Sequence, residues 1–236
     1  MYPFIFYDPT MLLLVPAFLL AMWAQFKVSS TFKKYSEIVT MRGLTGADAA
    51  RLILDKNGLN NVEVRHIDGN LTDNFDPRTN IVNLSDATYT SRSIGAIGVA
   101  AHECGHAVQY ATGYTPIRVR NAIVPVVSLC SNLAIPIVLI GIVLAAFGSY
   151  SPILIDIGII MYAATVVFQL ITLPVEFNAS SRALKTLNSY EMLNPEELNG
   201  AKKVLSAAAM TYVAAAFSAI MSLLRLILIS NRSRRD

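Results

Sequence analysis

The chain has 236 residues, of which 54% are hydrophobic and only 15% are charged. This balance leaves too little polar surface for an ordinary soluble domain and predicts a membrane protein. The formal net charge of +3 is modest, and no nucleic-acid partner is expected. The two cysteines, Cys104 and Cys130, provide no disulfide framework and suit a reducing compartment.

Four apolar runs are long enough to be considered as membrane spans, at residues 11–26, 122–147, 153–175 and 204–229. The first lacks the basic start of a secretory signal peptide and is followed by Lys27, so it predicts an uncleaved anchor. Only "GSYSP" separates the second and third runs, which indicates a tight helical hairpin. The fourth contains Arg225. We therefore expect three to four transmembrane helices.

The distribution of lysine and arginine predicts the orientation of these runs. Basic residues follow the first run, precede the second and follow the third: Lys27, Lys33, Lys34, Arg42, Arg51, Arg118, Arg120, Lys185, Lys202 and Lys203. By the positive-inside rule these segments are cytoplasmic, and the uncharged turn at 148–152 is outside. If the fourth run also crosses, the basic tail "NRSRRD" is outside as well. Otherwise residues 204–229 lie along the membrane interface or pack within the soluble part of the protein.

Residues 27–121 form the main soluble part of the chain. Thr45 and Asp48 have capping-box spacing, and Gly58 is a stop signal, so "TGADAARLILDKNGL" predicts a helix. A strand is expected at 62–67 and a hairpin at 69–85. An edge strand just before the next helix would bind an extended peptide through main-chain hydrogen bonds. An ordinary hairpin that covers the helix is the equal alternative.

The stretch "GVAAHECGHAVQ" fits the HExxH pattern, in which two histidines one turn apart share one metal ion. His102 and His106 are the expected ligands, and Glu103 is placed to take a proton from a metal-bound water. A proline-free helix can extend from Ser93 to Thr112 around them. Cys104 should face away from the metal. The alternative is a pair of core histidines bonded to backbone or carboxylate groups.

A catalytic zinc site needs a third protein ligand and an open position for water. His66 is the remaining histidine, but it lies on a predicted strand, where a hydrogen-bonding role is more common. Glu176 comes just after the third apolar run, and the HExxH segment comes just before the second. Both therefore lie on the same side of the membrane, so Glu176 is the better candidate. A surface glutamate is the alternative.

Three segments together carry a family resemblance: "LTDNFDPRTNIVNLS", "VAAHECGHAVQY" and "LPVEFNASSRAL", with a helical hairpin between the last two. In this order they resemble the YugP-type membrane zinc metallopeptidases over essentially the whole chain. They are similar, more distantly, to HtpX-type and CAAX prenyl proteases. The resemblance implies that His102, His106 and Glu176 bind zinc and that Glu103 is the base. It also implies a multi-pass protein of a bacterial type of cell membrane.

The chain departs from the family pattern at three positions. The family has a histidine where Asn74 stands and an aspartate where Asn178 stands, and the distant relatives have an aspartate at the position of Ser180. A carboxylate at position 178 or 180 would orient a ligand histidine, and Asn178 or Ser180 could accept the same hydrogen bond. A donor to the tetrahedral oxyanion is also needed. The candidates are Arg182, His66, Tyr190 and Tyr110.

The predicted fold is a mainly α membrane protein with a cytoplasmic α+β, zincin-like catalytic region that carries the HExxH helix. The expected organisation is an anchor, the catalytic region, a transmembrane hairpin, a cytoplasmic segment with the third ligand, and an apolar helix with a basic tail, at residues 1–26, 27–121, 122–175, 176–203 and 204–236. The expected partners are the lipid bilayer and a protein or peptide substrate.

The predicted function is zinc-dependent hydrolysis of peptide bonds at or near the cytoplasmic membrane face. One alternative is an intramembrane site-2-type protease, which needs an aspartate within a later span. Asp156 is the one aspartate in such a run, and it lies near the outer end. The other alternative is a non-enzymatic membrane scaffold with a metal site, against which Glu103 argues because a closed structural site needs no base.

Overall fold

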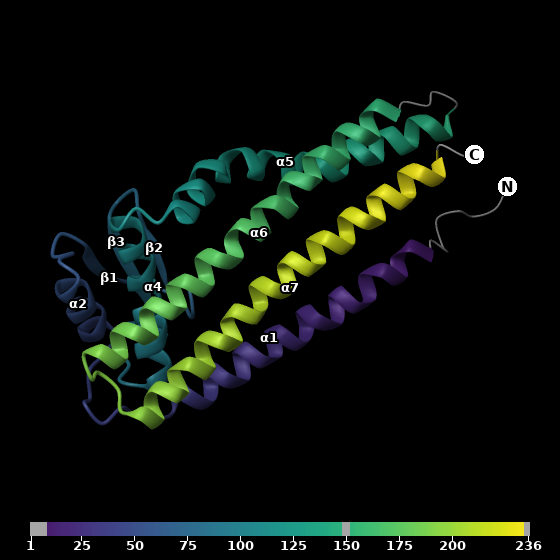
Figure 1. The fold of residues 1–236 in the computed structure, drawn as a ribbon. Helices are drawn as coiled ribbons and strands as arrows, with labels where there is room; N and C mark the ends of the chain where they lie inside the picture. Colours follow the sequence, from purple (N-terminus) through teal and green to yellow (C-terminus); the bar gives the residue numbers. More distant parts are fainter. Residues whose placement is uncertain (1–8, 148–151, 234–236) are drawn as a thin grey trace. The chain divides into compact units, whose positions relative to one another are not determined.

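The computed structural model describes residues 9–147 and 152–233 and is mainly helical (Figure 1). The described chain forms a short 3-10 helix, seven α-helices and three strands: η1 (Pro9–Leu13), α1 (Leu14–Ser36), α2 (Gly46–Lys56), β1 (Glu63–Ile67), β2 (Asn74–Asp76), β3 (Ile81–Ser85), α3 (Asp86–Tyr89), α4 (Ile94–Ala111), α5 (Thr115–Ala146), α6 (Pro152–Ser189) and α7 (Pro195–Ser233). It divides into two compact units. Among the described residues, one contains residues 9–23, 119–147, 152–172 and 212–233, and the other contains residues 24–118 and 173–211.

Four helical segments are long and apolar enough to cross a membrane: Pro9–Ser36, Thr115–Leu144, Ile153–Ser189 and Pro195–Asn231. They contain the four apolar runs of the sequence, so the expectation of a mainly helical chain with apolar helices of membrane-spanning length is confirmed. The fourth run belongs to the single helix α7, which continues to Ser233. Most of the turn expected at 148–152 lies outside the described residues.

Small residues allow α5 and α6 to pack closely within the apolar unit. A Cβ atom added to Gly158 would lie 2.9 Å from the carbonyl oxygen of Ala134, and one added to Gly141 would lie 2.7 Å from a side-chain carbon of Ile155. Glycine is therefore required for this approach. The pairing agrees with the helical hairpin predicted from the sequence.

The second unit contains a three-stranded sheet in the order β1-β3-β2. β2 and β3 are antiparallel, with Phe75 opposite Val82, which confirms the predicted hairpin. β1 pairs with β3 in parallel, with His66 opposite Leu84. The strand just before α4 in the chain is thus the central strand, and not an edge strand as the sequence suggested. β2, which packs against α4, is an edge of the described sheet instead.

Local sequence signals define the helices around this sheet. The Thr45 side chain accepts a hydrogen bond from the Asp48 N–H, and the Asp48 carboxylate accepts one from the Thr45 N–H, so the predicted capping box is present. α4 begins after Ser93, whose hydroxyl accepts a hydrogen bond from the Ala96 N–H at 3.2 Å. The core of this unit is apolar, and α2, α4, α6 and β3 contribute to it Ile53, Leu84, Ile97, Ala100, Cys104 and Leu187.

Candidate metal centre

α4 presents the two histidines of the HExxH segment on one face. The imidazole rings of His102 and His106 meet edge to face, with 4.7 Å between their centroids. This contact follows from their spacing, since residues four apart lie one above the other on a helix. His106 is only 9% exposed, and His102 is partly buried.

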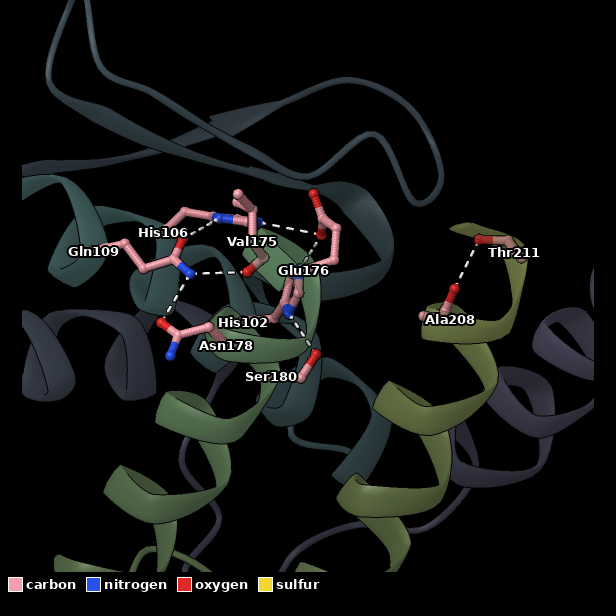
Figure 2. Close-up of polar contacts among 9 residues, drawn as sticks. All are labelled: His102, His106, Gln109, Val175, Glu176, Asn178, Ser180, Ala208 and Thr211. Atoms are coloured by element: carbon pink, nitrogen blue, oxygen red, sulfur yellow. Dashed lines mark hydrogen bonds and ion pairs between the residues drawn. The ribbon is translucent and has the colours of Figure 1, made fainter. Parts of the chain in front are cut away.

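α6 brings Glu176 to the same place. Its Oε2 atom lies 3.2 Å from His102 Nε2 and 3.4 Å from His106 Nε2 (Figure 2). Gly105 permits this approach, because a Cβ atom on it would lie only 2.6 Å from the carbonyl oxygen of Ala179. At the glycine within the HExxH segment the backbones of α4 and α6 are therefore too close to admit a side chain.

The three side chains form a group that could hold one metal ion, since their ligand atoms all lie within 4.8 Å of one another. Ligands about 2.0 to 2.1 Å from a tetrahedral zinc ion are about 3.3 Å apart by simple trigonometry. The two measured contacts to Glu176, 3.2 and 3.4 Å, agree with this spacing. Two imidazole nitrogens and one carboxylate oxygen also make a donor set that suits zinc. The residues present therefore fit the ion.

Glu103 is buried beside this group, with 9% of its surface exposed. Burial raises the pKa of its carboxyl group, and the neighbouring His102 and His106 partly oppose the shift. Within residues 9–147 and 152–233, its carboxylate has no hydrogen-bond or ion-pair partner. A buried carboxylate without a protein partner can exchange a proton with a small molecule such as water.

The Nδ1 atoms of both imidazoles, which face away from Glu176, have hydrogen-bonding partners (Figure 2). Ser180 Oγ lies 3.1 Å from His102 Nδ1. His106 Nδ1 lies 3.0 Å from Oε1 of Gln109, a residue that the sequence reasoning missed. Among the described residues, Asn178 makes no hydrogen bond to an imidazole and instead accepts one from the Gln109 amide at 3.0 Å. The spacing of three residues between His106 and Gln109 on one helix was the available signal.

Other candidates from the sequence lie elsewhere. His66 Nε2 is 2.7 Å from Asp86 Oδ1, and His66 is absent from the metal-binding group. The hydroxyl of Tyr190 donates to the carbonyl of Lys56. The Cys104 thiol is buried against α2, where it donates to the Ala50 carbonyl at 3.6 Å.

Two candidate oxyanion donors remain near the HExxH helix. Arg182 Nε donates to Asn178 Oδ1 at 2.8 Å, and its guanidinium group lies over the ring of Tyr114. Tyr110 follows His106 by one turn of α4, is 41% exposed and packs against Phe75 of β2. Of the four candidates, Arg182 therefore lies next to Asn178, and Tyr110 lies on the helix that carries the two histidines.

The elements and the side-chain group define a membrane protein of the zinc peptidase class, and comparison with known families agrees. The chain matches the family described as "Putative neutral zinc metallopeptidase" over residues 10–231, and it belongs to that family. It is 49% identical over 224 residues to "Putative membrane protease YugP" of Bacillus subtilis (strain 168), which covers 95% of this chain and 97% of the relative. The resemblance found in the sequence is thus confirmed. No solved structure matches the chain.

Proposed function

We propose that the chain is a zinc-dependent endopeptidase that hydrolyses peptide bonds of protein substrates at or near the cytoplasmic face of the membrane. In this proposal His102, His106 and Glu176 hold the metal ion, and Glu103 is the general base. The observation that carries it is the approach of Glu176 Oε2 to both Nε2 atoms at 3.2 and 3.4 Å, beside a buried carboxylate that has no hydrogen-bond partner among the described residues.

When bound, zinc supplies Lewis acidity that makes water nucleophilic near neutral pH and polarises a carbonyl group. Glu103 takes the proton from the attacking water and delivers it to the leaving amine. Its raised pKa suits this task, because a carboxylate that ionises at higher pH is a stronger base. Ser180 and Gln109 orient the imidazoles by contacting the nitrogens that face away from Glu176.

We assign the binding of extended substrate to β2. This strand has β3 as its one neighbour in the described sheet, and it packs against α4. An extended peptide that pairs with such an edge gains main-chain hydrogen bonds that do not depend on its side chains. Phe75 of β2 and Tyr110 of α4, whose ring centroids are 6.2 Å apart, link this edge to the HExxH helix.

The excess of lysine and arginine in residues 27–121 and 176–203 supports a cytoplasmic position for the site. These two segments supply all four proposed active residues. The substrate class that fits this location is a membrane protein, or an unfolded chain near the membrane surface.

The test replaces Glu103 with glutamine, which keeps the size of the side chain but cannot accept a proton. We expect this variant to retain zinc and to lose about 10² to 10⁴-fold in hydrolysis of a labelled unfolded protein. His102→Ala should lose both zinc and activity, because it removes a ligand. Unchanged hydrolysis in zinc-loaded Glu103→Gln would refute the assigned base. Absence of hydrolysis in the zinc-loaded wild type would favour a scaffold with a metal site.

A further inference from the structure

Gln109 occupies a fully buried position between the two helices that carry the candidate ligands. Its side-chain oxygen lies 3.0 Å from His106 Nδ1, and its side-chain nitrogen donates to the carbonyl oxygen of Val175 at 2.8 Å and to Asn178 Oδ1 at 3.0 Å (Figure 2). All of the amide's polar atoms are thus engaged. Val175 immediately precedes Glu176 in α6.

These partners determine which way the Gln109 amide points. A main-chain carbonyl such as that of Val175 can only accept a hydrogen bond, so the NH₂ group of Gln109 must face it. The amide oxygen must then face His106 Nδ1. An oxygen there can only accept, and so Nδ1 must carry the hydrogen. In the neutral imidazole, Nε2 then has a free lone pair directed towards the group that includes Glu176.

We propose that Gln109 is a positioning residue that fixes His106 as the Nδ1–H tautomer before the metal arrives. The proposal rests on the assignment of His106 as a zinc ligand. A ligand nitrogen must be unprotonated, so this tautomer prepares Nε2 for binding. Without Gln109, the nearby Glu176 carboxylate at 3.4 Å would favour a proton on Nε2, and this tautomer cannot bind a metal ion through Nε2.

His102 provides a comparison within the same site. Its Nδ1 faces the hydroxyl of Ser180, which can rotate and either donate or accept. Ser180 therefore does not select a tautomer, and the Glu176 carboxylate, 3.2 Å from His102 Nε2, favours a proton on that nitrogen when no metal is present. His102 must move this proton to Nδ1 on binding, whereas His106 need not.

The first experiment reads the tautomers directly. Zinc-free protein with ¹⁵N-labelled histidine is examined by long-range ¹⁵N–¹H NMR at alkaline pH, where imidazole is neutral. The chain has three histidines, so single His→Gln replacements assign the signals. We expect the Nδ1–H form for His106 in the wild type and the Nε2–H form in Gln109→Met. An Nε2–H signal for His106 in the wild type would overturn the proposal.

The Gln109→Glu variant distinguishes two roles of Gln109, selection of the His106 tautomer and anchoring of α6. Glutamate keeps an acceptor against His106 Nδ1, but its carboxylate can donate to neither Val175 nor Asn178. We expect it to retain the Nδ1–H form. If it instead behaved like Gln109→Met, the role of Gln109 would be anchoring, and the proposal would be wrong.

Zinc affinity, measured by competition with a chelator, gives the second readout. We expect Gln109→Met to bind zinc about 10 to 100-fold more weakly than the wild type. Thr112→Val is the matched control, because it removes a side-chain hydrogen bond to the backbone at the end of the same helix. Equal affinities in the two variants would contradict the proposal. A wild type that shows the expected tautomer but binds no zinc would refute the proposed function and not the positioning by Gln109.

Discussion

Gly105→Ala tests whether the close approach of α4 and α6 builds the metal site. The new Cβ atom would lie 2.6 Å from the Ala179 carbonyl oxygen. Ordinary carbon–oxygen contacts begin near 3.3 Å, so the helices must separate by about 0.7 Å. Ligand positions in a working site are held within about 0.2 Å. We therefore expect the variant to disturb the spacing between Glu176 and the two imidazoles.

The expected loss of zinc affinity follows from the cost of this overpacking. Restoring the ligand geometry against the clash costs about 1 to 3 kcal/mol. This cost converts to zinc binding that is weaker by about 5-fold to 150-fold. The fold should survive, because alanine gains about 1 kcal/mol over glycine in helix propensity and so offsets part of the strain.

Gly98→Ala is the matched control on the same helix. Its Cβ atom would lie 3.5 Å from the Cβ of Ala201, which is an ordinary contact, so zinc affinity should stay at the wild-type value. Chelator competition on detergent-purified protein measures the affinity, and thermal unfolding checks that both variants fold. Equal zinc affinities for the folded Gly98→Ala and Gly105→Ala variants would refute the reasoning.

Three further predictions concern the ligand set, the orientation and the soluble unit. Glu176→Ala should abolish zinc binding measured by metal analysis, whereas His66→Ala should retain it, and the reverse result would move the third ligand to the strand. A cysteine at Lys56 should react with an impermeant thiol reagent only in permeabilised cells, whereas one at Ser149 should react in intact cells; labelling of the first in intact cells would overturn the orientation. Thr45→Ala should lower the free energy of unfolding by about 1 kcal/mol through loss of the helix cap, with unchanged zinc affinity.

The features predicted correctly from the sequence are those that depend on neighbouring residues. The capping box at Thr45 and Asp48 and the antiparallel pairing of β2 with β3 need only short segments of chain. The parallel pairing of β1 with β3 depends on contacts between separated segments, and the sequence pattern contains no sign of it. For this reason the strand just before α4, which the sequence predicts as an edge, is the central strand.

The residues around the metal-binding group also fall into two classes, those predictable from nearby sequence and those that depend on tertiary contacts. Gln109 could have been found, because its spacing of three from His106 predicts contact on a helix. The position of Asn178 could not, because its amide reaches Gln109 only where α6 crosses α4. That crossing depends on a backbone contact at Gly105, which no side-chain pattern encodes.

On the face of α4 that meets α6, the residues that form the site differ from the apolar residues that stabilise the fold. At about 100° per residue, His102, Gly105, His106 and Gln109 lie within one third of the helix circumference. None of them is a large apolar residue. The apolar contacts of α6 with the core come instead from Ala183 and Leu187, which follow Glu176 along the same helix. Replacement of Gln109 should therefore alter the metal site while the apolar contacts that hold α6 in place remain.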